Sequence, residues 1–153
     1  MRNKLFYISL FVALIAAACS SEIEEDIVTK ERIEKIAEKV LVDSTAITFS
    51  LDSLTSYTWD EVYIITPYTQ LDRVTQTTRA DLSPIEKTGI ESADWKNVIA
   101  FISKGKLISY VDLPRNKGDF TYLNDSVLLY PYGATTFRMI NKNGRAVVEK
   151  IKN

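Results

Sequence analysis

Residues 60–66, with the sequence Asp60-Glu61-Val62-Tyr63-Ile64-Ile65-Thr66, include a short run that is apolar on both sides of an extended chain. Successive side chains of a strand point to opposite faces of its sheet. Val62 and Ile64 therefore share one face, and Tyr63 and Ile65 share the other. A strand with one solvated face would show polar residues at alternate positions, so this run predicts a central strand that is covered on both faces.

Two predicted hairpins follow this strand. In the first, residues 98–102 and 107–111 flank a turn at Ser103-Lys104-Gly105-Lys106. In the second, residues 135–140 and 146–151 flank Asn141-Lys142-Asn143-Gly144, and Asn-Gly readily adopts the positive φ angles of a type I′ turn. Two further strands are predicted at residues 47–51, where apolar and polar residues alternate, and at residues 127–130.

An amphipathic pattern precedes the strands. Apolar residues recur on one helical face, with charged residues between them: Ile33, Ile36, Ala37, Val40 and Leu41. This pattern predicts a helix over about residues 30–42, with Thr29 as its N-cap. Together the patterns predict an α+β domain over residues 29–153, in which one N-terminal helix packs on a mainly antiparallel sheet of about five to seven strands.

Residues 67–96 separate the predicted central strand from the first hairpin and are rich in Thr, Asp, Ser and Gln. Thr66-Pro67 is suited to open a short helix through about Val74, because Pro is well tolerated in a first turn. We expect the remainder to be a long surface loop. Ordered loops of this length are often functional, so it is the first place to look for a partner surface, and a mobile insertion is the equal alternative.

Composition excludes several classes of protein and of site. The 153-residue chain has a formal net charge of −1, is 46% hydrophobic, and contains one Cys and no His. These values fit one globular domain and exclude collagen-like, disordered and disulfide-stapled chains. Without an imidazole, Ser-His-Asp catalysis, Cys-His catalysis and the histidine-based zinc and iron sites are impossible. We expect no metal site and no cofactor.

Residues 1–18 have the features of a secretory signal peptide. Basic residues at the start are followed by apolar residues 5–15 and by three alanines immediately before Cys19. The alternative is a transmembrane helix with a buried thiol. It is the weaker interpretation, because residues 5–18 offer only 14 largely apolar positions and a spanning helix needs about 20.

The alanines before Cys19 resemble the lipobox of bacterial lipoproteins, in which the cysteine thiol is joined to diacylglycerol and becomes the acylated first residue. Ala16 stands where that family most often has Leu. The resemblance implies that Cys19 is the lipidation site and that a membrane is the partner at this end of the chain. Two or more acyl chains hold a protein stably on a membrane, whereas one gives only marginal binding.

Residues 19–28 are predicted to form an acidic tether, because residues 20–26 contain four acids and no base. Acidic residues just after an anchoring cysteine resemble the export tag that sends some Gram-negative lipoproteins to the outer face of the outer membrane. Ser20, where Asp would be the common inner-membrane retention signal, agrees with this. We therefore expect an outer-membrane lipoprotein, either periplasmic or surface-exposed.

Without His, and with Cys19 acylated, the candidate catalytic groups are carboxylates, Lys, Tyr and hydroxyls. Asp60, Glu61, Asp119 and Asp125 would supply a glycosidase pair only if two of their carboxyl groups stood about 5–10 Å apart, and the sequence does not bring them together. A carboxylate-based glycan hydrolase therefore stays an alternative, with no catalytic residue assigned. The basic C-terminal residues favour a solvated strand face, so no nucleic-acid partner is expected.

Residues 59–68, Trp59-Asp60-Glu61-Val62-Tyr63-Ile64-Ile65-Thr66-Pro67-Tyr68, resemble a group of uncharacterised small bacterial lipoproteins with a W-D-x-[VL]-x-[IV]-x-x-P-Y segment. In that group a hairpin and a P-R-x-x-G-D-F turn follow, to which residues 100–108 and 114–120 correspond here. Thr66 stands where the group often has Gly. The layout is similar to that of small α+β domains that bind other proteins and catalyse nothing, which is an analogy of fold alone.

These observations predict a non-enzymatic, lipid-anchored envelope lipoprotein that binds a protein or another envelope component. Tyr and Trp favour recognition surfaces, although core packing at strand ends is their more common role. The candidate binding surface has six members: Trp59, Asp60, Tyr68, Arg115, Asp119 and Phe120. The alternative is an inhibitor or immunity lipoprotein against a toxin or hydrolase, which would require one tight, stoichiometric partner.

Overall fold

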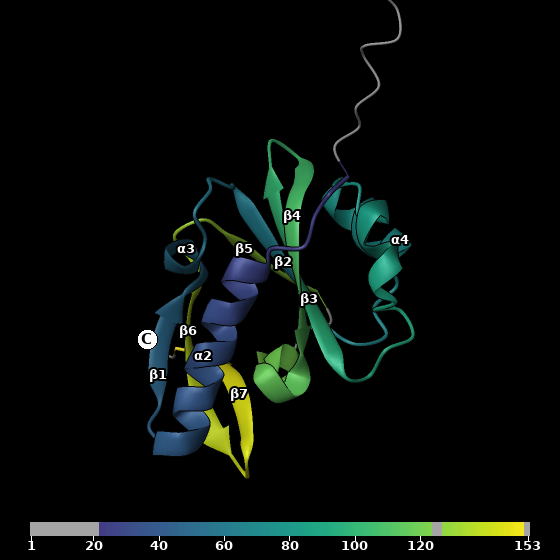
Figure 1. Ribbon diagram of the computed structural model, residues 1–153. Coiled ribbons are helices and arrows are strands. Elements are labelled where there is room, and N and C mark those ends of the chain that lie inside the picture. Colours follow the sequence, from purple (N-terminus) through teal and green to yellow (C-terminus); the bar gives the residue numbers. More distant parts are fainter. Residues whose placement is uncertain (1–21, 124–126, 152–153) are drawn as a thin grey trace, which may run out of the picture.

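The computed structural model describes residues 22–123 and 127–151 (Figure 1). Cys19, the predicted signal peptide and Asp125 lie outside the described residues. The elements, in chain order, are α2 (Ile27–Asp43), β1 (Ile47–Ser50), α3 (Leu51–Leu54), β2 (Glu61–Ile65), α4 (Leu71–Thr78), the 3₁₀ helix η2 (Ser83–Thr88), β3 (Lys96–Ser103), β4 (Lys106–Pro114), the short 3₁₀ turns η3 (Arg115–Lys117) and η4 (Phe120–Leu123), β5 (Val127–Pro131), β6 (Thr136–Lys142) and β7 (Arg145–Lys150). No helix in this described part is long and apolar enough to cross a membrane.

The predicted α+β fold class is confirmed, with one main helix and seven strands among the described residues. The strands form two antiparallel sheets, whereas the prediction placed them in one. The larger sheet has the order β4-β3-β2-β5 and the smaller one has the order β1-β6-β7. β2 pairs with β3 on one side and with β5 on the other, so it is a central strand as predicted.

The first core lies between one face of the larger sheet, helix α2 and the smaller sheet. Val62 and Ile64 of β2 point into it, together with Ile99 and Phe101 of β3. The smaller sheet contributes inward side chains such as Phe137, and α2 contributes the apolar stripe that its sequence predicted. This layer contains the single N-terminal helix of the prediction.

The second core lies on the opposite face of the larger sheet, and it corrects the expectation of a surface loop at residues 67–96. Tyr63 and Ile65 of β2 point into this core. Opposite them pack apolar residues of α4, η2 and their connections: Leu71, Val74, Ala80, Leu82, Ile85 and Ile90. Figure 1 shows α4 beside the sheet, on the side away from α2. These apolar residues are spaced irregularly among polar ones. The periodicity of the sequence therefore did not predict that this segment forms a buried layer.

Helix α2 begins earlier than predicted because Asp26, and not Thr29, is its N-cap. The Asp26 side chain accepts a hydrogen bond from the Thr29 backbone N–H at 2.9 Å. Thr29 is buried, and its hydroxyl donates to the Leu54 carbonyl. The helix therefore takes up the last two residues of the predicted tether.

Residues 22–26, which belong to the predicted tether, are attached to the domain. Glu25 pairs with Tyr110 of β4, and the Asp26 N–H donates to the Tyr110 carbonyl. Lys87 donates to the Glu22 carboxylate, and Ser109 donates to the Glu24 carbonyl. Residues 22–26 thus cover part of the outer edge of β4, a contact that composition alone did not reveal.

The turns of both predicted hairpins have the two successive positive φ angles that a type I′ turn requires. Lys104 and Gly105 have φ angles of 51° and 72°, and Asn143 and Gly144 have φ angles of 54° and 80°. The short helix after Pro67 was predicted too early. Residues 66–69 form a turn in which the Thr69 N–H donates to the Thr66 carbonyl, and the helix starts at Leu71.

We predict that Leu82→Ala will lower the free energy of unfolding by about 2–5 kcal/mol, because Leu82 is completely buried in the second core. Gln76→Ala, at an exposed position of α4, is the control and should change the value by less than about 0.5 kcal/mol. Urea denaturation followed by circular dichroism measures both. Equal, small effects would mean that residues 67–96 are a surface loop after all.

Candidate functional site

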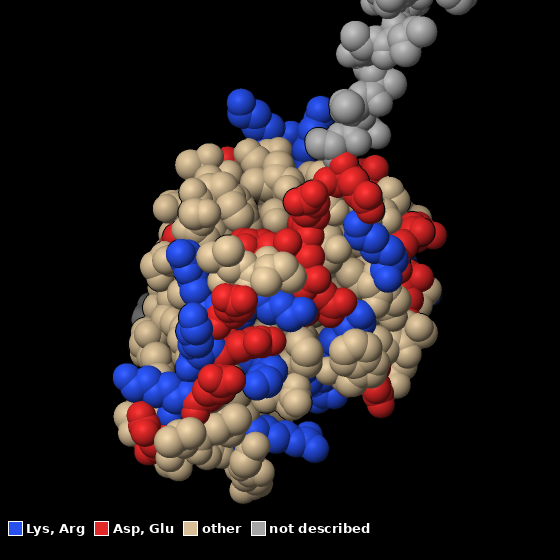
Figure 2. Space-filling model, in the orientation of Figure 1, with Lys and Arg blue, Asp and Glu red and all other residues tan. Residues whose placement is uncertain are grey.

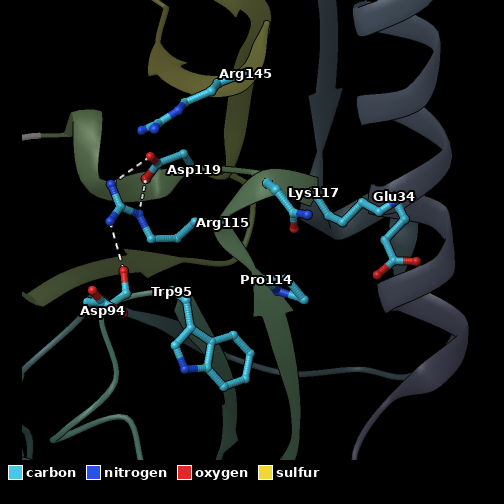
Figure 3. Close-up of a pocket in the computed structure, with 9 residues that line it drawn as sticks. Glu34, Asp94, Trp95, Pro114, Arg115, Lys117, Asp119 and Arg145 are labelled. Atoms are coloured by element: carbon cyan, nitrogen blue, oxygen red, sulfur yellow. Dashed lines mark hydrogen bonds and ion pairs between the residues drawn. The ribbon is translucent and has the colours of Figure 1, made fainter.

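A cleft of about 680 Å³ opens where the chain leaves β4 and turns through η3 towards the smaller sheet (Figure 3). Four parts of the chain supply its walls: the turn after β4, the residues just before β3, helix α2 and strand β7. The lining residues are Glu34, Asp94, Trp95, Pro114, Arg115, Asn116, Lys117, Asp119 and Arg145. The cleft therefore contains much of the predicted turn of residues 114–120.

An ion pair between Arg115 and Asp119 forms one wall of the cleft. The Arg115 Nε and Nη2 atoms donate to the two carboxylate oxygens of Asp119 at 3.1 and 2.8 Å. The Arg115 Nη1 atom donates to the Asp94 carbonyl at 2.8 Å. Two parallel bonds to one carboxylate fix a guanidinium in orientation as well as in position. The pair is thus a rigid part of the wall.

The turn that carries this pair is attached to both neighbouring layers. The Asp119 N–H donates to the Ala146 carbonyl of β7, and the Asn97 side chain donates to the Gly118 carbonyl. Gly118 packs so closely that a Cβ atom there would lie 2.9 Å from the Leu113 side chain. A side chain at this position would push the turn away from the core. Backbone bonds and close packing therefore set the geometry of the cleft before any ligand arrives.

Burial and hydrogen bonding shift the pKa of Asp119 in opposite directions. Burial of its side chain, which is 1% exposed, raises the pKa, but hydrogen bonds from Arg115 and Thr121 outweigh it and the pKa lies below its ordinary value. Hydrogen bonding to Asp119 also raises the pKa of Arg115. Asp119 is thus a carboxylate at neutral pH. It is poorly suited to act as a general acid.

Trp95 and Arg145 supply the accessible recognition groups. The Trp95 side chain is 58% exposed, and the Lys96 ammonium lies 4.7 Å from its ring centroid. Arg145 begins β7, directly after the Asn143-Gly144 turn, and is exposed. Figure 3 shows Trp95 and Arg145 on different sides of the Arg115–Asp119 pair. A partner in this cleft would meet an aromatic ring and a guanidinium group.

The structure brings together only Arg115 and Asp119 of the six predicted surface residues. Trp59 is 3% exposed and packs in the first core, where its ring lies 5.4 Å from the ring of Phe101. Phe120 is also completely buried, with its ring 6.0 Å from that of Phe137. For these two aromatic residues, the alternative of core packing is the observed one.

The other two predicted surface residues lie elsewhere. Asp60 is exposed and accepts a hydrogen bond from the Lys104 N–H at the β3–β4 turn. Tyr68 is 59% exposed and lines a separate groove of about 420 Å³ beside α4. Asp60 and Asp119 lie near opposite ends of β4, which spans nine residues and therefore about 30 Å. They do not form the carboxylate pair that a glycosidase needs.

Sequence reasoning missed Trp95, Arg145 and Glu34. A Trp close to the start of a predicted strand, inside the segment singled out for partner binding, was an available signal for Trp95. Nothing local in the sequence indicates that Glu34 of α2 and Arg145 of β7 line the same cleft, because that depends on how the layers pack. Within the described part of the chain, no group of three or more His, Cys, Asp or Glu residues is arranged to hold a metal ion.

Comparison of the chain with protein-family models, curated proteins and solved structures found no match. The resemblance of residues 59–68 and 114–120 to small envelope lipoproteins stays a prediction. What these residues do in the structure is known: the first set crosses the centre of the larger sheet, and the second builds the wall of the cleft.

We predict that Asp119→Asn will lower the free energy of unfolding at pH 7 by about 1–3 kcal/mol, because the buried bonds to Arg115 lose their charge. It should also weaken the acid dependence of stability. A carboxyl group with a lowered pKa stabilises the fold above its ordinary pKa, near ~3.9, and loses this effect as the pH falls through its folded pKa.

The measurement is urea denaturation from pH 7 to pH 2.5. Glu31→Gln, at an exposed carboxylate on α2, is the control and should leave the acid dependence intact. An Asp119→Asn protein with the same acid dependence as the wild type would show that the Arg115–Asp119 pair contributes nothing to it.

Proposed function

We propose that this protein is a lipid-anchored envelope lipoprotein that binds a protein or another envelope component and catalyses no reaction. Cys19 is the proposed anchor, after removal of residues 1–18, and the outer membrane is the proposed location. The proposed binding site is the cleft bounded by Trp95, Arg115 and Arg145.

The position of the cleft relative to the start of the described chain is the observation that supports this proposal best. Residues 22–24 lie beside Lys87 and Ser109, near the β3–β4 turn. Arg115 follows the other end of β4, six residues and therefore about 20 Å beyond Ser109. A domain anchored through Cys19 would thus carry the cleft away from its attachment. An approaching partner could reach it without displacing the anchored segment.

The types of residue in the cleft also favour protein binding. Trp and Arg are enriched among the residues that dominate binding energy at protein interfaces. Trp95 is accessible in spite of its size, and the Arg115 guanidinium is already oriented by Asp119. Prior orientation lowers the conformational cost of association. The cleft is therefore better prepared for binding than a set of mobile surface side chains would be.

The arrangement of carboxylates supports a non-enzymatic role over the glycan-hydrolase alternative. Asp119 is engaged by Arg115 and Thr121, and hydrogen bonding holds its pKa low. Asp60 lies near the far end of β4 and accepts a bond from the Lys104 N–H. A hydrolase mechanism based on these two groups would need a proton donor and a second carboxylate nearby, and this pair provides neither.

We expect metabolic labelling with a palmitate analogue to mark the wild-type protein and not Cys19→Ala. Acylation requires the Cys19 thiol, and alanine removes only that group. Fractionation of the same cells should recover the labelled protein with the outer membrane. Equal labelling of the two proteins would contradict the anchor.

We expect Trp95→Ala to reduce recovery of a crosslinked partner from intact envelopes by at least about fivefold, because truncation of a central interface Trp costs more than ~1 kcal/mol. Tyr132→Ala is the matched control. Like Trp95, Tyr132 is an exposed aromatic residue, with 56% of its surface exposed. It lies outside the cleft, beside Asp60 at the start of β2.

One partner recovered in a 1:1 ratio would favour the inhibitor or immunity alternative, and several partners would favour a scaffold. Recovery that falls equally with Trp95→Ala and Tyr132→Ala would contradict the cleft as the binding site.

A further inference from the structure

The charges around the cleft are only partly compensated. Arg115 pairs with Asp119, and Lys117 pairs with Glu38 at 3.2 Å. Across residues 22–123 and 127–151, no ion pair is formed by three other charged groups of the cleft: Glu34, Asp94 and Arg145. The Asp94 carboxylate acts electrostatically on Arg115, so Glu34 and Arg145 are the charges most available to a ligand.

The available charges are separated in space. In Figure 3, Arg145 lies on one side, next to the Arg115–Asp119 pair, and Glu34 lies on the opposite side, on α2. Trp95 and Pro114 lie along the third side, and the Asp94 carboxylate adds negative charge near Arg115. The cleft thus has a positive end at Arg145, a negative end at Glu34 and an apolar surface beside them.

This polarity restricts what the cleft can accept. A nucleic acid or another polyanion would bring negative charge against Glu34 and Asp94, which is unfavourable. A neutral glycan would leave both ends of the cleft uncompensated. A peptide segment can carry both signs of charge on either side of an apolar side chain, and a cleft of about 680 Å³ is within the range of sites that enclose small ligands.

We propose that the cleft binds a peptide segment of a partner protein in which an acidic residue faces Arg145, a basic residue faces Glu34, and an apolar or aromatic side chain between them packs on Trp95. This inference rests on the proposed binding function and adds the chemistry of the partner. Figure 2 shows acidic and basic side chains interspersed on the face of Figure 1, so a steering field of one sign does not dominate that face. Recognition therefore depends on the local arrangement within the cleft.

The test uses four synthetic pentapeptides with Trp at the centre, Gly on each side of it and blocked ends. Their outer residues are Glu and Lys, two Glu, two Lys, or two Gln. Each is titrated into the isotope-labelled full chain in uncharged maltoside micelles, and binding is followed by the amide NMR signals of Trp95 and Arg115. The Glu/Lys peptide should bind about three- to tenfold more tightly than the others, because exposed ion pairs contribute ~0.2–1 kcal/mol each.

Charge reversal separates recognition from loss of structure. Arg145→Glu should shift the preference to the two-Lys peptide, and Glu34→Lys should shift it to the two-Glu peptide. Lys39→Glu, at an exposed position of α2 outside the cleft, should leave the order unchanged. A gain of affinity for a new peptide cannot come from unfolding.

Equal affinities for the four peptides, an order that the reversals do not change, or no shift of the cleft signals would each overturn the inference. Crosslinking in intact envelopes tests the proposed binding function separately. A partner that depends on Trp95 but shows no charge preference would leave that function standing.

Discussion

Strands β2 and β3 carry apolar side chains on both of their faces, and this property determines how the rest of the chain is arranged. Each buried aliphatic side chain stabilises the fold by about 1.5–3 kcal/mol relative to exposure, so neither face of the strands can remain in water. One face is covered by α2 and the smaller sheet, and the other by α4 and η2. The layers follow from the need to cover a doubly apolar sheet.

The cleft is a consequence of this layering. After β4 the chain crosses beside β7 of the smaller sheet, through η3 and Gly118, before β5 returns to the larger sheet. Gly118 packs against Leu113 and is held by Asn97. The crossing places Arg115 and Asp119 at a boundary where elements of the first core meet the residues before β3. Because core packing and an ion pair hold this boundary, its shape does not depend on mobile loops.

Patterns that depend on neighbouring residues were predictable from the sequence. The alternation in β2, the helical stripe of α2 and the Asn-Gly turn are all local, and each gave the right element. Patterns that depend on tertiary packing were not. Residues 67–96 lack a clear period because their apolar side chains fill gaps over a sheet, and Asp26 could not be identified as the N-cap before the path of residues 22–26 was known.

The candidate site shows the same division. The turn containing Arg115 and Asp119 was singled out because it resembles the P-R-x-x-G-D-F turn of small lipoproteins, whereas Trp59 and Phe120 were assigned to a surface although both fill the core. Residue type cannot tell an aromatic anchor of an interface from an aromatic residue of a core, since both bury a large apolar area. Arg145 and Glu34 join the site from two distant elements and could be recognised only in the folded chain.

Native-state hydrogen exchange tests the central claim, a sheet whose two faces are both covered, most directly. Amides of β2 and β3 should exchange only through global unfolding, and the amides of Val74 and Ile85, which donate to the Gln70 and Leu82 carbonyls, should be protected by several kcal/mol. Exchange of Val74 and Ile85 at the rate of an unstructured chain, with β2 still protected, would contradict the account. It would mean that residues 67–96 do not form the second layer.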